Sequence, residues 1–168
     1  MNKKILIATL VIVIISVIVL FIIINQSTKE KFIKGNENLY DIATQNIIDN
    51  YESPDKDKKM YKTFISTKKF GITEDKDYKY AYLWILSKGY YIDDNNKVVE
   101  STGSSMPYKF TFTKDNKLVD YQIPEDGKKY NESIKEMYPD KIEEEVLNYK
   151  PDQEELEKQV KDFYKDKK

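Results

Sequence analysis

The sequence contains no cysteine and no histidine, and every basic residue in it is a lysine. Without thiol and imidazole groups the chain can form no disulfide, no zinc site with cysteine or histidine ligands, and no Cys–His or Ser–His nucleophile pair. Any catalysis would depend on carboxylate, lysine, tyrosine or serine side chains. The sequence therefore predicts a protein that is not an enzyme and that uses no metal and no cofactor.

The chain also lacks an excess of either charge. Its 28 lysines are balanced by 29 acidic residues, which leaves a formal net charge of −1. Nucleic-acid binding requires a clustered basic surface, so this balance argues against a nucleic-acid partner. Charged residues make up 34% of the chain, but aromatic residues make up 13%, which is typical of a folded domain rather than a disordered tail.

One long apolar run dominates the N-terminal part of the chain. Residues 5–24, which begin at Ile5 and end at Ile24, carry no charged side chain over twenty positions. A helix of this length covers about 30 Å, the thickness of the hydrocarbon core of a bilayer. We therefore expect a transmembrane anchor that contacts the lipid bilayer. The expected segments, in order, are a cytoplasmic leader (1–4), the anchor (5–24), a juxtamembrane link (25–31) and an extracytoplasmic domain (32–168).

A cleaved signal peptide is the alternative for this run. Signal peptides have a shorter apolar core, of about 7–15 residues, followed by small residues at the cleavage site. The run ends in IIINQS, which offers no such site, so the pattern favours an uncleaved anchor. Lysines flank both ends of it (Lys3 and Lys4 before, Lys29, Lys31 and Lys34 after), so the positive-inside rule is nearly balanced. The short leader favours a cytoplasmic N-terminus, which predicts a single-pass cell-membrane protein with its C-terminal domain outside the cytoplasm.

Beyond the anchor, the hydrophobic period changes from helical to alternating and back. Apolar residues recur every three or four positions over residues 29–51, which predicts a helix. Alternating segments joined by short turns then predict an antiparallel meander. Its expected strands are 61–70, 78–93, 97–100, 108–113 and 118–123, the last with Val119, Tyr121 and Ile123 facing inward. The helical period returns three times from about residue 131. We predict an α+β fold, with a helix packed on a four- to five-stranded antiparallel sheet as in cystatin-like or nuclear-transport-factor-like folds, and with C-terminal helices.

The strongest strand signal has apolar side chains on both faces, which predicts a central strand that is covered on both sides. One face carries Tyr78, Tyr80, Tyr82 and Trp84, and the other carries Ala81, Leu83 and Ile85. We call the first set the tyrosine ladder. If its rings are exposed, they could stack against glycan rings or dock a partner. Burial beneath the helices is the alternative interpretation.

A second candidate site is the loop predicted at residues 101–105. The backbone amides near Gly103 and the hydroxyls of Ser104 and Ser105 could hold an anion or a peptide carboxylate. Alternatively, the segment is a turn that sets the register of the strand starting at Tyr108, with glycine supplying an unusual backbone angle. The candidate binding residues are Gly103, Ser104, Ser105, Tyr108, Tyr78 and Tyr80.

Two pairs of neighbouring aspartates raise the question of calcium binding. Asp75 with Asp77, and Asp93 with Asp94, lack the D-x-D-x-D-G spacing with a distal glutamate that a calcium loop needs. We therefore predict that both pairs lie in solvated turns.

Three stretches resemble a soluble module found in small membrane-anchored proteins of Gram-positive bacteria. They are YKYAYLWILSKGYY, GSSMPYKFTF and IPEDGKKYNESIKEMYP, which fall within residues 70–139. This module is also similar to the C-terminal extracytoplasmic region of some membrane metallopeptidases related to β-lactam sensor-transducers. The peptidase part does not carry over, because its zinc site needs H-E-x-x-H and this sequence has no histidine. The resemblance implies an accessory or sensory extracytoplasmic module.

Together these inferences predict a non-catalytic, membrane-anchored module that binds or senses a membrane or cell-wall protein. A passive structural or accessory subunit of a membrane complex is the alternative of a different class. A carboxylate-based hydrolase of cell-wall glycans is the third alternative, and it needs two acidic side chains at a defined separation. No motif in the sequence sets such a separation.

Overall fold

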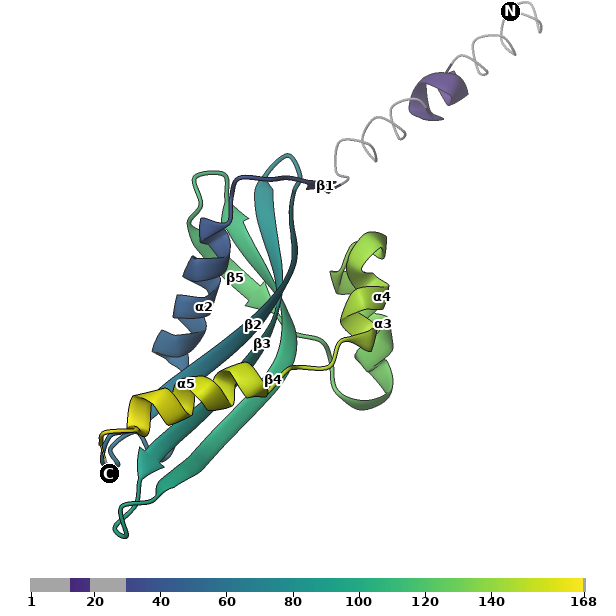
Figure 1. Cartoon of the computed structure of the whole chain (residues 1–168). Coiled ribbons are helices and arrows are strands. Elements are labelled where there is room, and N and C mark those ends of the chain that lie inside the picture. The colour runs from purple at the N-terminus through teal and green to yellow at the C-terminus, as the bar shows by residue number, and fades with distance from the viewer. Residues whose placement is uncertain (1–12, 19–29, 168) are drawn as a thin grey trace, which may run out of the picture.

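Five antiparallel strands form one sheet in the order β1-β2-β3-β4-β5, and helices pack on it (Figure 1). The computed structural model describes residues 13–18 and 30–167. The strands are β1 (Lys31–Phe32), β2 (Lys62–Glu74), β3 (Tyr78–Ile92), β4 (Val98–Thr113) and β5 (Leu118–Gln122). The helices are α2 (Asn38–Asn50), the 3₁₀ helix η1 (Gly127–Lys129), α3 (Tyr130–Met137), α4 (Asp140–Asn148) and α5 (Glu154–Tyr164). The predicted α+β class is confirmed, with a helix on an antiparallel sheet and further helices at the C-terminal end.

Tight turns join the long strands β2, β3 and β4 into a meander. In the β2–β3 turn the Asp75 carboxylate accepts two backbone N–H bonds of 2.8 Å. In the β3–β4 turn Asp93 accepts two such bonds, of 3.0 and 2.7 Å. Asn96 and Asn116 close the β3–β4 and β4–β5 turns at φ of 57° and 66°, a left-handed conformation that asparagine tolerates well. The aspartate pairs therefore lie in turns, as predicted.

Helix α2 covers one face of the sheet. Its Leu39, Ala43 and Ile47 pack against apolar side chains of β2, β3 and β4. The buried residues of this layer are Leu39, Tyr40, Ala43, Ile47, Ile72, Ala81, Leu83, Ile85, Tyr108, Phe110 and Phe112. A helix of 13 residues is marginal in isolation, so this packing is what stabilises α2.

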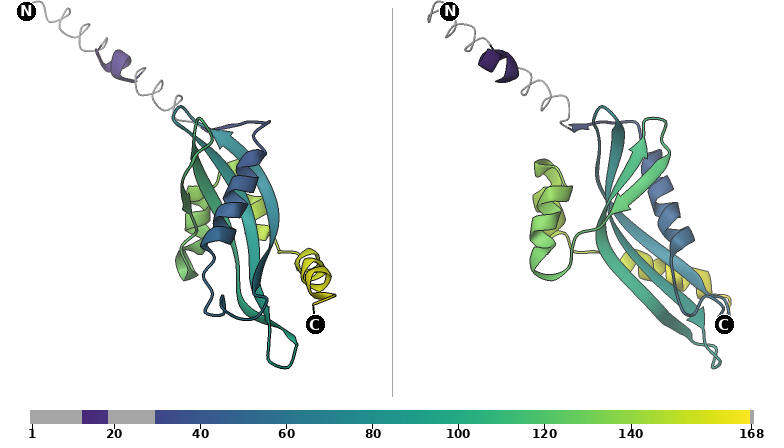
Figure 2. Two further views of the ribbon diagram at one scale, coloured as in Figure 1. Left: turned by 90° about the vertical axis from the view of Figure 1, so that its left-hand side faces the viewer. Right: turned by 180° about the vertical axis from the view of Figure 1, so that it is seen from behind.

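The C-terminal helices cover the opposite face, with α3 and α4 over one part of it and α5 over another (Figure 2). The core between the sheet and α3 and α4 contains Tyr82 of β3 together with residues of these helices and of the link between them, namely Ile134, Met137, Tyr138, Ile142 and Val146. The core between the sheet and α5 contains Phe64, Leu86 and Ile92 of the sheet and Leu156, Val160 and Tyr164 of the helix. Strand β3 contributes side chains to both layers. The prediction of a central strand covered on both sides is therefore confirmed.

The helix predicted from residue 29 begins only at Asn38, so that boundary is wrong. The chain first adds β1 to the edge of β2, and the N–H of Ile33 then donates to the Ile72 carbonyl at 3.0 Å. Gly35 follows at φ 79°, a conformation that glycine adopts without steric cost, and it turns the chain away from the sheet. Pairing with β2 therefore prevails over the local helical period.

Strand β2 also extends beyond its predicted end at Gly71 and runs to Glu74. A bulge between Lys69 and Gly71 interrupts the ladder with β3, and the strand continues after it. A Cβ on Gly71 would lie 2.9 Å from the Phe32 ring. Glycine is needed here because β1 crosses close to the backbone.

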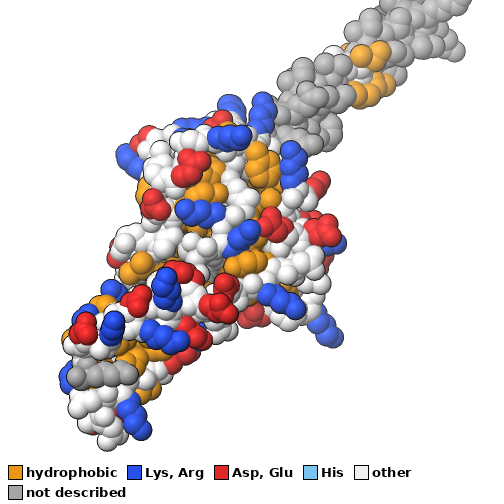
Figure 3. Space-filling model, in the orientation of Figure 1, with side chains coloured by type: hydrophobic (Ala, Val, Ile, Leu, Met, Phe, Trp, Pro, Cys, Tyr) orange, Lys and Arg blue, Asp and Glu red, His pale blue; other side chains and the backbone are white. Residues whose placement is uncertain are grey.

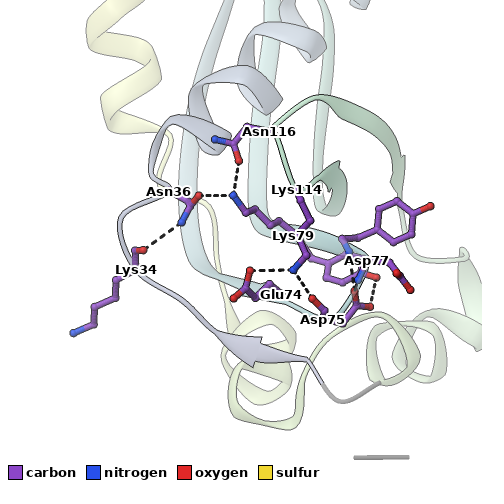
Figure 4. A network of polar contacts seen from close by, with 10 residues as sticks. Lys34, Asn36, Glu74, Asp75, Asp77, Lys79, Lys114 and Asn116 are labelled. Atoms are coloured by element: carbon purple, nitrogen blue, oxygen red, sulfur yellow. Dashed lines mark hydrogen bonds and ion pairs between the residues drawn. The ribbon is translucent and has the colours of Figure 1, made fainter. Parts of the chain in front are cut away.

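A polar network joins three segments at the end of the sheet where β1 lies (Figure 4). The Lys79 ammonium donates to the side-chain oxygens of Asn36 at 3.0 Å and Asn116 at 2.7 Å. Lys114 donates to Glu74 at 3.1 Å. These bonds connect the β1–α2 link, the end of β2 and the β4–β5 turn, so this end of the sheet is held by side chains as well as by strand pairing.

The predicted transmembrane span, 5–24, lies outside the described residues except for 13–18, which are helical. Within that turn the Ser16 hydroxyl donates to the Val13 carbonyl at 2.8 Å. In the part of the chain that the structure describes, no helix is both long and apolar enough to cross a membrane.

Candidate functional site

A groove of about 830 Å³ opens on the α2 face of the sheet, between α2, β4 and β5. Its lining comes from residues within 46–52, from Ser87 of β3, from residues 102–104 and Tyr108 of β4, and from 118–121 of β5. The groove exists because α2 ends at Asn50 and β5 is only five residues long. Neither element extends over the middle of β4 on this face.

The structure brings only part of the predicted site together. Gly103, Ser104 and Tyr108 all line the groove. Ser105 belongs to the opposite face, where its hydroxyl oxygen accepts a hydrogen bond from the Trp84 indole at 2.9 Å. Successive side chains of a strand point to opposite faces, so Ser104 and Ser105 could not both belong to one surface.

The tyrosine ladder is largely covered by the C-terminal helices. Tyr82 has no exposed surface, and Trp84 is partly buried against a tyrosine that follows α4. Tyr80 is also partly buried, and its hydroxyl donates to the Asp75 carboxylate at 2.8 Å. Tyr78 remains 40% exposed at the end of the strand. The ladder therefore forms mainly core, and Tyr78 and Tyr80 lie on the face opposite the groove.

The loop predicted at 101–105 is part of β4, so that prediction is wrong. Gly103 pairs with Lys88 of β3, and the ladder continues through Ser104 and Ser105. On the other side of Gly103 a bulge interrupts the ladder, which resumes where Glu100 pairs with Tyr90. The glycines with positive φ in the described chain are Gly35, Gly71 and Gly127, so Gly103 does not supply an unusual angle. A Cβ added there would meet its nearest atoms at 3.5 Å, an ordinary contact. Pairing with β3 decides the conformation, and the local Gly-Ser-Ser composition does not.

Several groove residues were missed by sequence reasoning. Val119, Tyr121 and Ile123, expected to face inward, are 52%, 43% and 47% exposed. They lie on or next to an edge strand that α2 does not cover. Glu52 and Asp120 carry no motif, because their place in one groove depends on how α2 and β5 lie on the sheet.

The groove differs in charge from the rest of the molecule. Figure 3 shows lysine and acidic side chains interspersed over the face seen in Figure 1. Glu52 contributes a carboxylate to the groove, and none of the lysines in the described chain is among its lining. Asp120 is also part of the lining, but it pairs with Thr111, which pairs with Tyr80 on the opposite face, so its side chain points away from the groove. Tyr51, Tyr108 and Tyr121 also line it, and burial raises the pKa of the Tyr108 hydroxyl, which stays neutral. This lining suits a ligand with a positive charge.

A second polar cluster lies on the opposite face and centres on Glu30. One carboxylate oxygen accepts hydrogen bonds from the Thr73 hydroxyl, at 2.7 Å, and from the Tyr82 hydroxyl. The other accepts from the Lys109 ammonium at 2.9 Å. That ammonium also lies 4.3 Å from the centre of the Tyr80 ring. We call this the Glu30 cluster; its charged groups bind one another, so it fastens the segment before β1 onto three strands.

A cavity of about 210 Å³ lies beside the Glu30 cluster, against the end of α3 and the start of α4. Tyr138 lines it, and its buried hydroxyl has no hydrogen-bond partner among the described residues. Burial raises the pKa of this hydroxyl. No group of three or more acidic side chains in the described chain is arranged to hold a metal ion.

No protein-family model, no curated protein and no solved structure matches this chain. We therefore base the function on the groove and on the residues that line it.

Proposed function

We propose that this protein is a membrane-anchored, extracytoplasmic module that binds a protein partner through the groove on the α2 face, without catalysis. The groove is the observation that carries this proposal. It is a concave surface of about 830 Å³ on a sheet that carries helices on both faces. Ligand sites are typically concave, with a few polar groups that converge on them.

The position of the groove supports tethered binding. The uncharged run at residues 5–24 is long enough to span a bilayer, and the Glu30 cluster fastens the chain that follows it to the sheet. The groove lies at the C-terminal end of α2, whereas the chain enters the domain near the N-terminal end of that helix (Figure 1). A domain held in this way would present the groove away from the lipid surface.

The helix packed across an antiparallel sheet also agrees with the cystatin-like comparison, and the resemblance to accessory modules of membrane proteins points to the same kind of role. Tethering raises the effective concentration of a partner in the same membrane to the millimolar range, so a weak contact would suffice. A passive structural subunit remains the alternative. It predicts no selective contact at the groove.

In-cell photo-crosslinking tests the proposal with two neighbouring positions. A photoreactive residue at Ser104 would sit in the groove, and one at Ser105 would sit on the opposite face. We expect one dominant crosslinked protein from position 104 and none in common from position 105. A diffuse pattern at both positions would contradict binding through the groove and favour the structural alternative.

Topology is tested separately by adding protease to intact cells. We expect the C-terminal domain to be degraded while the cells remain closed. Survival of the domain until lysis would contradict the extracytoplasmic location.

The hydrolase alternative needs acidic side chains in the groove, and Glu52 supplies one carboxylate there. If this carboxylate acts in catalysis, the full-length protein releases soluble product from purified cell-wall glycan. Loss of that product in Glu52→Gln would replace the proposal by an enzymatic one. We expect no release by the unaltered protein.

A further inference from the structure

Building on the proposed function, we infer that the groove takes an extended polypeptide segment that carries a lysine or arginine, and that this segment adds to the sheet as a strand along the free edge of β4. The inference names the chemical class of the partner. It rests on the pairing of β4, on the charges of the groove and on its tyrosine rings.

The first observation is a long unpaired edge. Strand β4 has 16 residues, but its register with β5 covers only residues 109–112. From 98 to 108 the described chain pairs with β4 only on the β3 side. Backbone N–H and C=O groups on such an edge are a template for another strand, and peptide recognition by strand addition uses this geometry.

The free edge and the groove are continuous. Residues 102–104 belong to both, and Gly103 is exposed and carries no side chain of its own. Pro107 has no N–H to donate, so a new ladder would extend from 106 toward 102. An added strand of about five residues would place alternate side chains in the groove and away from it.

The opposite edge of the sheet is not open in the same way. Strand β1 and the N–H of Ile33 occupy the end of β2 that runs from Ile72 to Glu74. Farther along, the Gln159 side chain of α5 donates to the Ile65 carbonyl at 3.2 Å. The edge of β4 beside the groove is therefore the better template.

The second observation is charge complementarity. The groove is lined by the exposed Glu52 side chain and by no lysine of the described chain, in a protein with 28 lysines. Tyr51, Tyr108 and Tyr121 add ring faces that attract a cation placed over them. An acidic peptide would meet a like charge and no counter-charge. A basic side chain that projects from the added strand would meet the Glu52 carboxylate and aromatic rings.

The test uses the full-length protein in detergent micelles and a phage-displayed library of random octapeptides. We expect enriched peptides to contain lysine or arginine among β-branched or aromatic residues. The best of these is then synthesised in three forms: unmodified, N-methylated at the odd-numbered residues, and N-methylated at the even-numbered residues. One of the two methylated forms should not bind, because it lacks the N–H donors that face β4. The other should still bind, because its missing donors face away from β4.

Protein variants test whether the negative charge of the groove contributes to peptide binding. Glu52→Gln should weaken binding of the unmodified peptide by about threefold, because one solvent-exposed charge interaction is lost. Glu157→Gln changes an exposed carboxylate on α5, on the other face, and should leave the affinity unchanged. Trp84, the single tryptophan, reports by fluorescence whether each variant is folded.

The outcomes separate this inference from the proposed function. Enrichment of peptides without basic residues, no enrichment over empty micelles, or equal binding of both N-methylated forms would overturn strand addition by a basic segment. The peptide series tests strand addition even if the Glu52→Gln variant fails to fold. If crosslinking from Ser104 still captures one protein in cells, the binding role stands without this inference; if neither experiment finds a ligand, both fall.

Discussion

Replacing Glu30 by alanine gives the sharpest test of how the domain is held together. Its carboxylate accepts hydrogen bonds from Thr73, Tyr82 and Lys109, which belong to β2, β3 and β4. Removing it leaves the Lys109 ammonium, only 14% exposed, without its counter-charge. It also removes the acceptor shared by the Thr73 and Tyr82 hydroxyls; these lie 3.2 Å apart and can keep one hydrogen bond between them, which leaves one donor unpaired next to the fully buried Tyr82.

The magnitude follows from the number and burial of these bonds. A hydrogen bond to a charged group contributes about 1.5–3 kcal/mol, and breaking one half of a buried ion pair costs about 3–5 kcal/mol. The three bonds share one carboxylate and are not additive, and the Glu30 side chain is 24% exposed, so water can replace part of the loss. We therefore expect Glu30→Ala to lower the free energy of unfolding by about 3 kcal/mol. For a chain of this size that corresponds to a fall in Tm of about 6–12 °C.

Thermal and urea unfolding of the full-length protein in detergent, followed by Trp84 fluorescence, measures this effect. Trp84 packs between the sheet and the segment after α4, so its signal reports the unfolding of this domain. Glu157→Ala is the matched control, since its pair with Lys161, at 4.0 Å, is exposed and should change stability by less than about 0.5 kcal/mol. A double-mutant cycle of Glu30 and Lys109 should give a coupling of at least about 1 kcal/mol. Equal stability of Glu30→Ala and the control would refute the role of the Glu30 cluster.

Three further predictions concern packing, backbone and pH. Tyr164→Phe removes the hydroxyl that donates to the carbonyl oxygens of Met60 (2.8 Å) and Tyr90 (2.9 Å). Urea unfolding should show that the free energy of unfolding falls by about 1–2 kcal/mol. An unchanged free energy of unfolding would contradict the view that this hydroxyl holds α5 on the sheet. Gly103→Ala should leave the free energy of unfolding unchanged or raise it by up to about 0.5 kcal/mol, because residue 103 lies in a strand with room for a Cβ. A fall of more than about 2 kcal/mol would show that the backbone there needs glycine. Burial raises the pKa of eight tyrosines above 10, so their contribution to stability is complete below about pH 10 and is lost as pH rises toward their folded pKa values. An absorbance titration should therefore reach full tyrosine ionisation only when the protein unfolds. Complete titration of the folded protein with ordinary pKa values would contradict this. The eight are Tyr40, Tyr80, Tyr82, Tyr90, Tyr108, Tyr130, Tyr138 and Tyr164.

Local patterns in the sequence were enough to predict the class of the fold and several of its elements. Apolar side chains at both the even- and the odd-numbered positions of residues 78–86 indicated a strand buried on two faces. The structure places that strand at the centre of the sheet. The helical period after residue 131 predicted the three C-terminal helices. These signals are local, because helical and strand periods are set by the backbone geometry of a few neighbouring residues.

Long-range pairing decided what the local patterns could not. Residues 101–105 have the composition of a loop, yet residues 103–105 pair with β3 as part of a strand, and this separates Ser104 from Ser105 onto opposite faces. Glu30 binds Lys109, which lies 79 positions away in the sequence, and nothing near either residue signals this contact. Glu52 and Asp120 come to one groove only because α2 and β5 both leave the middle of β4 uncovered. A contact between distant segments depends on register and on how helices lie on a sheet, and these are properties of the whole packed chain rather than of any stretch within it.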